Sequence, residues 1–397
     1  MIQFSRRHER IEPSATIETA KLSRKLISEG RDVINMSMGM PDFNTPGHIK
    51  DAAKAAIDEN FTFYPPVAGY PDLKEAIVHK LKRDNKLEYS IDNIVVSAGA
   101  KLSVANLMLA LLNKEDEIII PAPYWVSYTG ILSLVGAKEK IVPCGIEQDY
   151  KLRPEQLESA INKNTKAFIF SSPCNPTGSL YDSNELKALV DVLIKHPNIV
   201  VISDEIYEYI NFSGKHKSIA SFSAIKDRVV IINGVSKGFA MTGWRIGYVA
   251  APKPIAKACE KIQGQLTSGA CSIAQKAAKE ALTAPLKCAK EMCDAFEKRK
   301  NIMYKYLQGI KGVKCNDPKG AFYFFPNMEY FIGKSYKAYQ INSSEDLCHY
   351  LLMEGNVACV GGSSFGAPSC IRLAYAISEE QIHKAMKRIK ECLEVLE

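Results

Sequence analysis

The stretch from Asp227 to Tyr248 reads DRVVIINGVSKGFAMTGWRIGY. Its first part is an unbroken run of apolar, β-branched residues, which is typical of a buried strand. Shortly after that run, Lys237 stands between a serine and a glycine, and Arg245 follows eight positions later. A lysine in such a turn is either a solvated surface residue or an amine brought to a site, and the surrounding sequence has to decide between them.

Short apolar runs like this one recur along the middle of the chain, where they alternate with amphipathic stretches of helical length. Between about residues 94 and 249 the runs are NIVVSAG, DEIIIPAP, KEKIVPC, TKAFIFSSP, NIVVISDE, RVVIING and RIGYVAAP. Strands that alternate with helices predict a mostly parallel sheet that is covered on both faces. We therefore predict an α/β fold, in which the ligand site lies beyond the carboxyl ends of the strands.

The segments on either side of this region predict a second, smaller α/β domain. A helical pattern, LKCAKEMCDAFEKRKNIMYKYLQGI, leads to the strand-like pieces GAFYFFP and SCIRLAYA and to a last helix over 378–396. No Gly- or Ser-rich linker separates the two parts, so we expect a long helix to connect them. The predicted organisation is an N-terminal arm over residues 1–12, part of the small domain over 13–45, a large domain over 46–285, and the C-terminal small domain over 286–397.

Composition excludes several classes of protein. The chain has 397 residues, 46% of them hydrophobic, and a formal net charge of +7. Its basic residues are interspersed with acids, as in KLKRDNKLE, which predicts solvated helix faces and no nucleic-acid partner. The eleven cysteines form no C-x-x-C motif and the N-terminus has no signal-peptide pattern, which predicts a cytoplasmic protein with reduced thiols. No cluster has metal-ligand spacing, and no apolar run has the length of a membrane span.

The residues that follow the strands suggest what the lysine could do. An amine at a site can form a Schiff base with a carbonyl, and pyridoxal phosphate is the cofactor that uses a lysine in this way. The pyridine nitrogen of that cofactor needs a poorly solvated carboxylate, and Asp204 ends a strand where such a group is expected. A helix N-cap is an equally common role for an aspartate. Three residues later, Tyr207 could hydrogen-bond the ring hydroxyl or serve only in packing.

A phosphate group needs backbone amides at a helix N-terminus and a cation. The segment VVSAGAKLSVANLMLALL offers a strand, a small-residue turn and a helix, so Gly99, Ala100 and Lys101 could present amides to an anion. Such a turn alone is weak evidence for a phosphate site, because every α/β protein has several turns of this kind. Arg245 is a candidate for the cation.

Two further strand ends carry candidate ligands of a planar cofactor. In SSPCNPTG, Pro173 and Pro176 restrict the backbone around Asn175, which favours a rigid turn that holds its amide over a ligand. A generic loop remains the alternative. Trp125 in PAPYWVSY could stack on the ring, or it could be a core tryptophan.

Taken together and in order, these motifs resemble those of the class I aminotransferases of pyridoxal-phosphate fold type I, and most closely the bacterial aspartate aminotransferase branch. The resemblance covers essentially the whole chain, through PSAT, GMPDFNTP, FYPPVAGYPDL, GAKLSV, PYWVSY, SSPCNPTG, SDEIYE, SKGFAMTGWRIGY and CIRLAYA. It implies a large domain with a mostly parallel seven-stranded sheet and a smaller α/β domain.

The resemblance also implies roles around the cofactor ring. Lys237 would be the Schiff-base lysine, Asp204 the partner of the pyridine nitrogen, and Trp125 the stacking residue. Tyr207 and Asn175 would hold the ring oxygen. Lys237, Asp204 and Tyr207 are thus the predicted catalytic residues.

For the phosphate, the resemblance adds Arg245 to the amides that follow Ser97. It further implies that Tyr64 reaches the phosphate from the neighbouring subunit, which requires a homodimer. Arg372 resembles the arginine that clamps the α-carboxylate of the substrate, with the backbone of Gly39 beside it. Trp125 and Asn175 are the other residues expected to contact the substrate there.

Lys101 resembles the residue that recognises the distal carboxylate of a dicarboxylic substrate, with help from Ser14 and Thr16. We therefore expect amino transfer from aspartate to a 2-oxo acid such as 2-oxoglutarate. The chain departs from the related pattern at Glu12, often a basic residue, at Met40 in GMPDF, and at Gly234, often a serine. Glu12 argues against a prephenate-like substrate, and Gly234 removes one phosphate hydroxyl.

Other functions remain as alternatives. An aminotransferase of aromatic or other amino acids, or a β-lyase, would use the same cofactor. A pyridoxal-phosphate-dependent regulator would need a DNA-binding module, and only a short arm precedes the first motif. A nicotinamide dehydrogenase would need G-x-G-x-x-G after the first strand, which is absent from the sequence.

Overall fold

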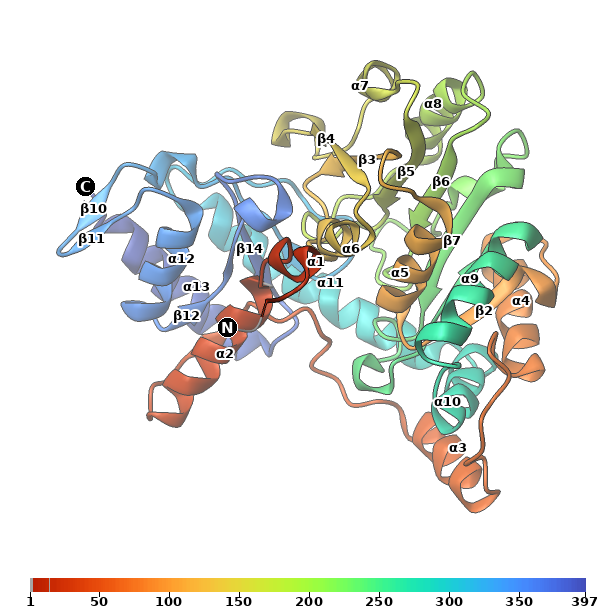
Figure 1. Cartoon of the computed structure of the whole chain (residues 1–397). Helices are drawn as coiled ribbons and strands as arrows, with labels where there is room; N and C mark the ends of the chain where they lie inside the picture. Colours follow the sequence, from red (N-terminus) through yellow and green to blue (C-terminus); the bar gives the residue numbers. More distant parts are fainter. Residues whose placement is uncertain (1–2, 14) are drawn as a thin grey trace.

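A seven-stranded sheet forms the centre of the larger part of the molecule (Figure 1). The computed structural model describes residues 3–13 and 15–397. The strands, in spatial order, are β2 (Ile94–Ser97), β8 (Gly247–Ala250), β7 (Val229–Gly234), β6 (Val200–Asp204), β5 (Thr165–Ser171), β3 (Glu117–Ala122) and β4 (Lys138–Pro143). All seven apolar runs of the sequence therefore lie in one sheet, as predicted.

The sheet is parallel apart from β8, which runs antiparallel to both β2 and β7 among the described strands. The connection from β7 to β8 spans residues 235–246 and contains only a short 3₁₀ turn, Thr242–Trp244. A parallel connection would need a crossover helix, so this short one returns the chain in the opposite direction. The returning segment carries Lys237 and Arg245 along the same edge of the sheet.

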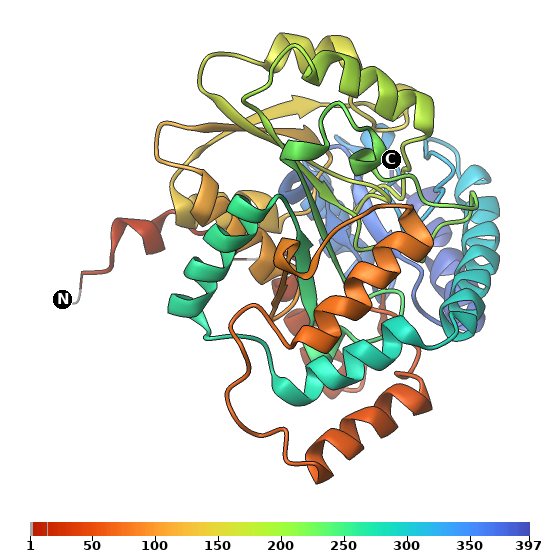
Figure 2. The ribbon, with the colours of Figure 1, turned by 90° about the vertical axis from the view of Figure 1, so that its right-hand side faces the viewer.

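Helices cover both faces of the sheet, as predicted. One face packs against α5 (Ala100–Leu111), α6 (Ser127–Val135) and α9 (Lys253–Leu266). The other packs against α3 (Gly47–Asp58), α4 (Pro71–Asn85), α7 (Pro154–Ala160), α8 (Ser183–Leu193) and α10 (Ser272–Thr283). Figure 2 shows α3, α10 and α4 side by side on this second face.

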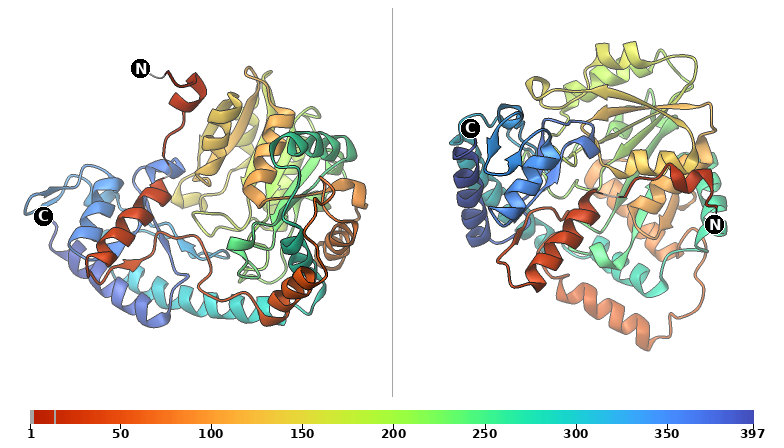
Figure 3. Two further views of the ribbon diagram at one scale, coloured as in Figure 1. Left: turned by 60° about the horizontal axis from the view of Figure 1, so that its bottom comes forward. Right: turned by 60° about the vertical axis from the view of Figure 1, so that its left-hand side comes forward.

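The C-terminal part has a core of its own beside the sheet (Figure 1). It contains α12 (Ser344–Met353), α13 (Glu379–Glu394) and a small antiparallel sheet of β13 (Val360–Gly361), β14 (Ile371–Ala374) and β9 (Tyr323–Phe324). A short strand from early in the chain, β1 (Ile34–Asn35), pairs with β12 (Val357–Ala358). The N-terminal helix α2 (Ala15–Ser28) packs against β12 and β13, as both views of Figure 3 show.

The helix α11 (Lys287–Gln308) connects the two parts, as expected from the sequence. Ala289 in its first turn belongs to the core of the sheet, whereas Met292, Met303 and Leu307 belong to the second core. The helix therefore crosses from one core into the other. The last helix begins where predicted, because the Ser378 hydroxyl accepts a hydrogen bond from the Gln381 amide.

Three short elements complete the described fold: α1 (Arg6–Glu9), and the paired strands β10 (Ser335–Tyr336) and β11 (Tyr339–Gln340). Among the described helices, none combines the length and the apolar character that a membrane span requires. The domain boundaries and the cytoplasmic location remain predictions from the sequence.

Candidate active site

A cavity of about 270 Å³ opens at the carboxyl ends of the central strands and reaches the small sheet of the second core. Ten of the predicted site residues line it: Gly39, Ala100, Lys101, Trp125, Asn175, Asp204, Tyr207, Lys237, Arg245 and Arg372. Thr16 lines it too, while Ser14 lies outside the described residues. The cavity therefore joins segments that are far apart in the sequence.

Lys237 places its amine inside this cavity. Its Nζ donates a hydrogen bond to the carbonyl oxygen of Gly39 at 2.5 Å. Burial, together with the positive charges of Arg372 and Arg245, lowers the pKa of Lys237 to about 8. A substantial fraction of the amine is therefore neutral near pH 7.5, which is the form that acts as a nucleophile or a base.

Asp204 is the last residue of β6 and its carboxylate is held by two donors. The Tyr128 hydroxyl donates to Oδ2 at 2.7 Å, and the Ile206 amide donates to Oδ1 at 3.3 Å. Burial raises the pKa of Asp204 to about 6, although the hydrogen bond from Tyr128 opposes this shift. Sequence reasoning missed Tyr128; its place three residues after Trp125, in a helical segment, was the available signal.

An anion cradle lies at the N-terminus of α5. Gly99 precedes the helix with a φ of 86°, and a Cβ at this position would collide with the guanidinium of Arg245. Although Gly99 does not line the cavity, its missing side chain brings Arg245 against the first turn of α5. Within the described residues, the amides of Ala100 and Lys101 have no acceptor, as expected for a first helical turn. Two free amides and a guanidinium suit a phosphate group.

The departure at Gly234 has a steric cause. A Cβ there would lie 2.8 Å from the Cα of Gly247 and 2.8 Å from the carbonyl oxygen of Ile246. The close approach of β7 and β8 leaves no room for a serine at this position. Ser236, two residues later, lines the cavity and supplies a hydroxyl that the sequence reasoning did not consider.

Arg372 lies on β14 of the second core and lines the cavity. It is a buried cation with an exposed fraction of 2%. Its Nη1 donates to Asn175 Oδ1 at 3.1 Å and its Nη2 to the carbonyl oxygen of Ser37 at 2.6 Å. Its Nε has no partner, and no carboxylate pairs with the guanidinium among the described residues. A buried cation with only neutral partners suits an anionic ligand.

The Tyr207 hydroxyl lies 2.7 Å from the Tyr323 hydroxyl, and either oxygen can be the donor. Tyr323 comes from β9 of the second core, and sequence reasoning had treated its segment, GAFYFFP, only as a strand. At the mouth of the cavity, Lys101 Nζ lies 5.4 Å from the ring centroid of Trp125. This places a cation and an aromatic ring side by side at the entrance.

Tyr64 does not reach the cavity of its own chain. Its exposed fraction is 93%, and that of Phe63 is 80%. Two adjacent aromatic side chains in water are unusual for a chain with no partner at that surface. The predicted role of Tyr64 across a subunit interface remains a prediction.

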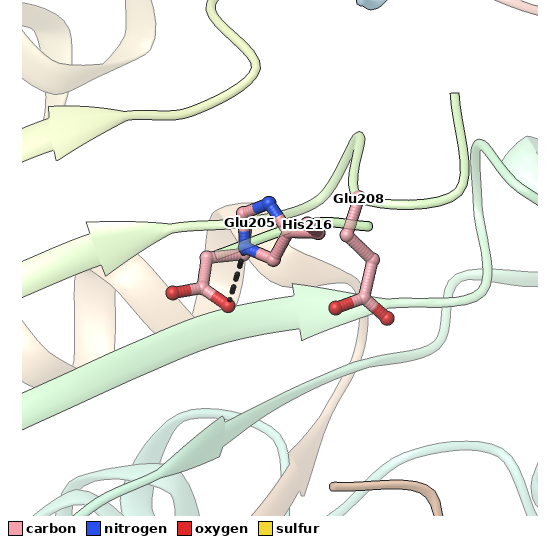
Figure 4. Close-up of side chains that lie close together, drawn as sticks. All are labelled: Glu205, Glu208 and His216. Carbon is pink, nitrogen blue, oxygen red and sulfur yellow. Dashed lines mark ion pairs between the residues drawn. The ribbon is translucent and has the colours of Figure 1, made fainter. Parts of the chain in front are cut away.

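A second group of charged side chains, all from the chain that follows β6, lies close together (Figure 4). His216 Nε2 lies 3.0 Å from Glu205 Oε2, and Glu208 forms an ion pair with Lys80. The hydroxyls of Ser203 and Ser218 donate to the other oxygen of Glu205. Although three of these residues have metal-ligand chemistry, the ammonium of Lys80 already neutralises Glu208. Two carboxylates and two cations, with His216 protonated, form a charge-balanced cluster.

This cluster makes stability depend on pH. Burial alone would lower the pKa of His216, but the charge and hydrogen bond of Glu205, together with the charge of Glu208, outweigh burial and raise the pKa above its ordinary value. The stabilisation is therefore complete below the unfolded pKa and disappears as the pH rises through the folded pKa. We expect His216→Gln to lower the Tm by several degrees at pH 6 and by much less at pH 9. The exposed His79→Gln variant is the control, and an equal loss at both pH values would contradict the assignment.

Comparison with known proteins adds an independent observation. Residues 31–389 match the family model for aminotransferase class I and II. A probable aspartate/prephenate aminotransferase of Rhizobium leguminosarum bv. phaseoli is 45% identical over 385 residues, 96% of each chain. The crystal structure of the aspartate aminotransferase from Rhizobium meliloti superposes with a TM-score of 0.96 at 37% identity, covering 100% of both chains. The aspartate aminotransferase of Thermus thermophilus with maleate gives a TM-score of 0.92 at 34% identity, covering 99% of this chain and 100% of that one.

Proposed function

The chain belongs to the class I and II aminotransferases, and from this premise we propose that it transfers the amino group of aspartate to a 2-oxo acid such as 2-oxoglutarate. The enzymes of this family depend on pyridoxal 5′-phosphate. The observation that carries the substrate proposal is the pair of cations, Arg372 and Lys101, that line one cavity with the amine of Lys237. Two cations suit a substrate with two carboxylates.

The residues of the cavity fit the cofactor on three counts. The free amides of Ala100 and Lys101, with Arg245, suit its phosphate. Asp204 is a buried carboxylate whose pKa is raised by burial, and a protonated ring nitrogen beside it would stabilise its charged form. Lys237 supplies a buried amine. When bound, the cofactor supplies a carbonyl that accepts the amino group and a ring that withdraws electrons from the substrate α-carbon.

We assign the chemistry of the protein to a few groups. The Nζ of Lys237 would hold the cofactor covalently, and once the substrate amine has displaced it, the freed neutral amine would remove the proton from the substrate α-carbon. A base with a pKa of about 8 is well matched to a reaction near neutral pH. Asp204 would keep the ring nitrogen protonated, and Tyr128 fixes the orientation of its carboxylate. Trp125 would stack on the ring, and Asn175 and Tyr207 would hold the ring oxygen.

The same proposal assigns the two ends of the substrate. Arg372 binds the α-carboxylate through the edge that carries its unpaired Nε, and Asn175 and Ser37 fix the plane of the guanidinium. Lys101 binds the distal carboxylate at the mouth of the cavity, close to Trp125 and on the side lined by Thr16. The aspartate aminotransferase of Thermus thermophilus was solved with maleate, a dicarboxylate, which supports this arrangement.

We further propose that the enzyme is a homodimer in which Tyr64 contacts the phosphate site of the partner. The exposure of Phe63 and Tyr64 supports an interface at this surface. A Tyr64→Phe variant that binds cofactor as tightly as the wild type would argue against the contact.

Lys101 provides a direct prediction about specificity. Replacing it with Met should lower kcat/KM for aspartate by roughly 10- to 100-fold, because the distal carboxylate loses a charged partner. The rate with alanine, which has no distal carboxylate, should change little. Lys101→Arg keeps the charge and is the matched control. An equal loss of kcat/KM for aspartate and alanine would show that Lys101 acts on every substrate and does not recognise the distal carboxylate.

Assays with several substrates test the activity itself. We expect aspartate with 2-oxoglutarate to be turned over faster than tyrosine or cystathionine. Higher activity on tyrosine would favour an aromatic aminotransferase, and on cystathionine a β-lyase. The name of the Rhizobium leguminosarum relative includes prephenate, and this keto acid belongs in the same assay. We propose 2-oxoglutarate over prephenate because Glu12 brings a negative charge ahead of α2, and faster turnover of prephenate would overturn that choice.

A further inference from the structure

We propose that Tyr323 is a positioning residue that links the small sheet to the segment after β6 and holds the Tyr207 hydroxyl as a donor to the ring oxygen of the cofactor. This inference rests on the proposed function. Tyr207 follows β6 of the large sheet, whereas Tyr323 lies on β9 of the second core. The hydrogen bond between their hydroxyls, at 2.7 Å, therefore joins the segment after β6 to the small sheet, and both side chains pack in the second core.

The surroundings of Tyr323 fix the position of its ring. The guanidinium of Arg372 lies 4.8 Å from its ring centroid. Its backbone is paired with Ala374 on β14, and the side chain is fully buried although it lines the cavity. A Cβ at Gly39 would lie 2.5 Å from its hydroxyl oxygen, so the Gly39 backbone closes on that hydroxyl from a third side. Tyr323 thus contacts the groups proposed to hold the ring oxygen and the α-carboxylate.

The direction of the hydrogen bonds follows from the number of protons. A phenol hydroxyl donates once and can accept as well. If Tyr207 donates its proton to an oxygen in the cavity, it can only accept from Tyr323. The two hydroxyls then form a chain that runs from Tyr323 through Tyr207 to the ring oxygen. Each hydrogen bond in such a chain polarises the next, so Tyr207 becomes a stronger and better oriented donor.

The ring and the hydroxyl of Tyr323 have separate roles. Its ring supports Arg372, and its hydroxyl supports Tyr207. Tyr323→Phe removes only the hydroxyl, so the support for Arg372 remains. Tyr323→Leu removes both. A residue with a purely structural role would not separate the two effects in this way.

The test measures the pH midpoint at which the visible absorbance of the bound cofactor changes, together with KM for aspartate. Loss of a donor makes the ring oxygen hold its proton more tightly, so we expect the midpoint to rise in Tyr323→Phe. The expected rise is roughly 0.5 to 1 pH unit, equivalent to one hydrogen bond. KM should stay within about twofold in this variant and rise roughly 10-fold in Tyr323→Leu, which loses the cation–π contact.

A double-mutant cycle with Tyr207→Phe makes the inference specific. If Tyr323 acts through Tyr207, the double variant should have the midpoint of Tyr207→Phe alone, because the chain is already broken. Additive shifts, or an unchanged midpoint in Tyr323→Phe, would overturn the proposal. Tyr375→Phe is the matched control, since its buried hydroxyl bonds the Ala321 carbonyl outside the cavity. Failure of the wild type to bind cofactor or to use aspartate would refute the proposed function, a result distinct from an additive cycle.

Discussion

Lys237→Ala should abolish amino transfer, with kcat falling by roughly 10⁴-fold, the upper range for loss of a general acid–base group. The variant loses the amine proposed to bind the cofactor covalently and to move the substrate proton. Borohydride reduction should attach the cofactor to Lys237 in the wild type, and mass spectrometry of the digest should find no attachment in the variant.

Two comparisons separate the chemistry of Lys237 from its charge. Lys237→Arg keeps a cation and a donor for the Gly39 carbonyl, but a guanidinium is not a base at neutral pH. It should therefore be as inactive as the alanine variant. A small exogenous amine such as methylamine should restore part of the activity of Lys237→Ala, which leaves space, but not of Lys237→Arg. Full activity in either variant would refute the assignment of Lys237.

Asp204→Asn should lower kcat/KM for aspartate by roughly 10²- to 10³-fold, as expected for loss of one preorganised electrostatic partner. Asparagine has nearly the same shape but carries no charge, so the ring nitrogen loses its counter-ion. The matched control is Asp182→Asn at the N-cap of α8, where the side chain accepts from the amides of Asn184 and Glu185. Because asparagine is as good an N-cap as aspartate, that variant should change both the stability and the activity little.

Asp204→Asn should also make the cofactor-free protein more stable at alkaline pH. The pKa of Asp204 is about 6 in the fold against an ordinary value of 3.8, so the fold prefers the protonated carboxyl. That preference stabilises the protein fully below pH 3.8 and is lost as the pH rises through 6. At pH 8 the wild type therefore carries a buried, unpaired charge. Asp204→Asn should gain on the order of 2 kcal/mol there, measured by urea unfolding, and the gain should vanish near pH 4. An equal urea concentration at the unfolding midpoint for the wild type and Asp204→Asn at pH 8 would contradict the burial of a charged carboxylate.

The strand ends were predictable because parallel strands bring their carboxyl ends to one edge of a sheet. Asn175, Asp204 and Lys237 each follow an apolar run, so the run locates the residue without any knowledge of its contacts. The anion cradle was predictable for the same reason, since a strand, a glycine and a helix are consecutive in the sequence.

Residues that reach the cavity from other elements carried no comparable signal. Tyr128 lies on a helix and meets Asp204 only through packing, and Tyr323 comes from a different core. The direction of β8 and the cluster around His216 also depend on contacts between distant segments. Local sequence patterns do not encode such contacts, whereas the fold creates them.

The helix α11 has a mechanical consequence. Because Ala289 packs in one core and Leu307 in the other, the two cores are joined by one continuous helix. Any rotation of the second core relative to the sheet would therefore strain this helix, and it would move β14, with Arg372, relative to the wall that carries Lys237.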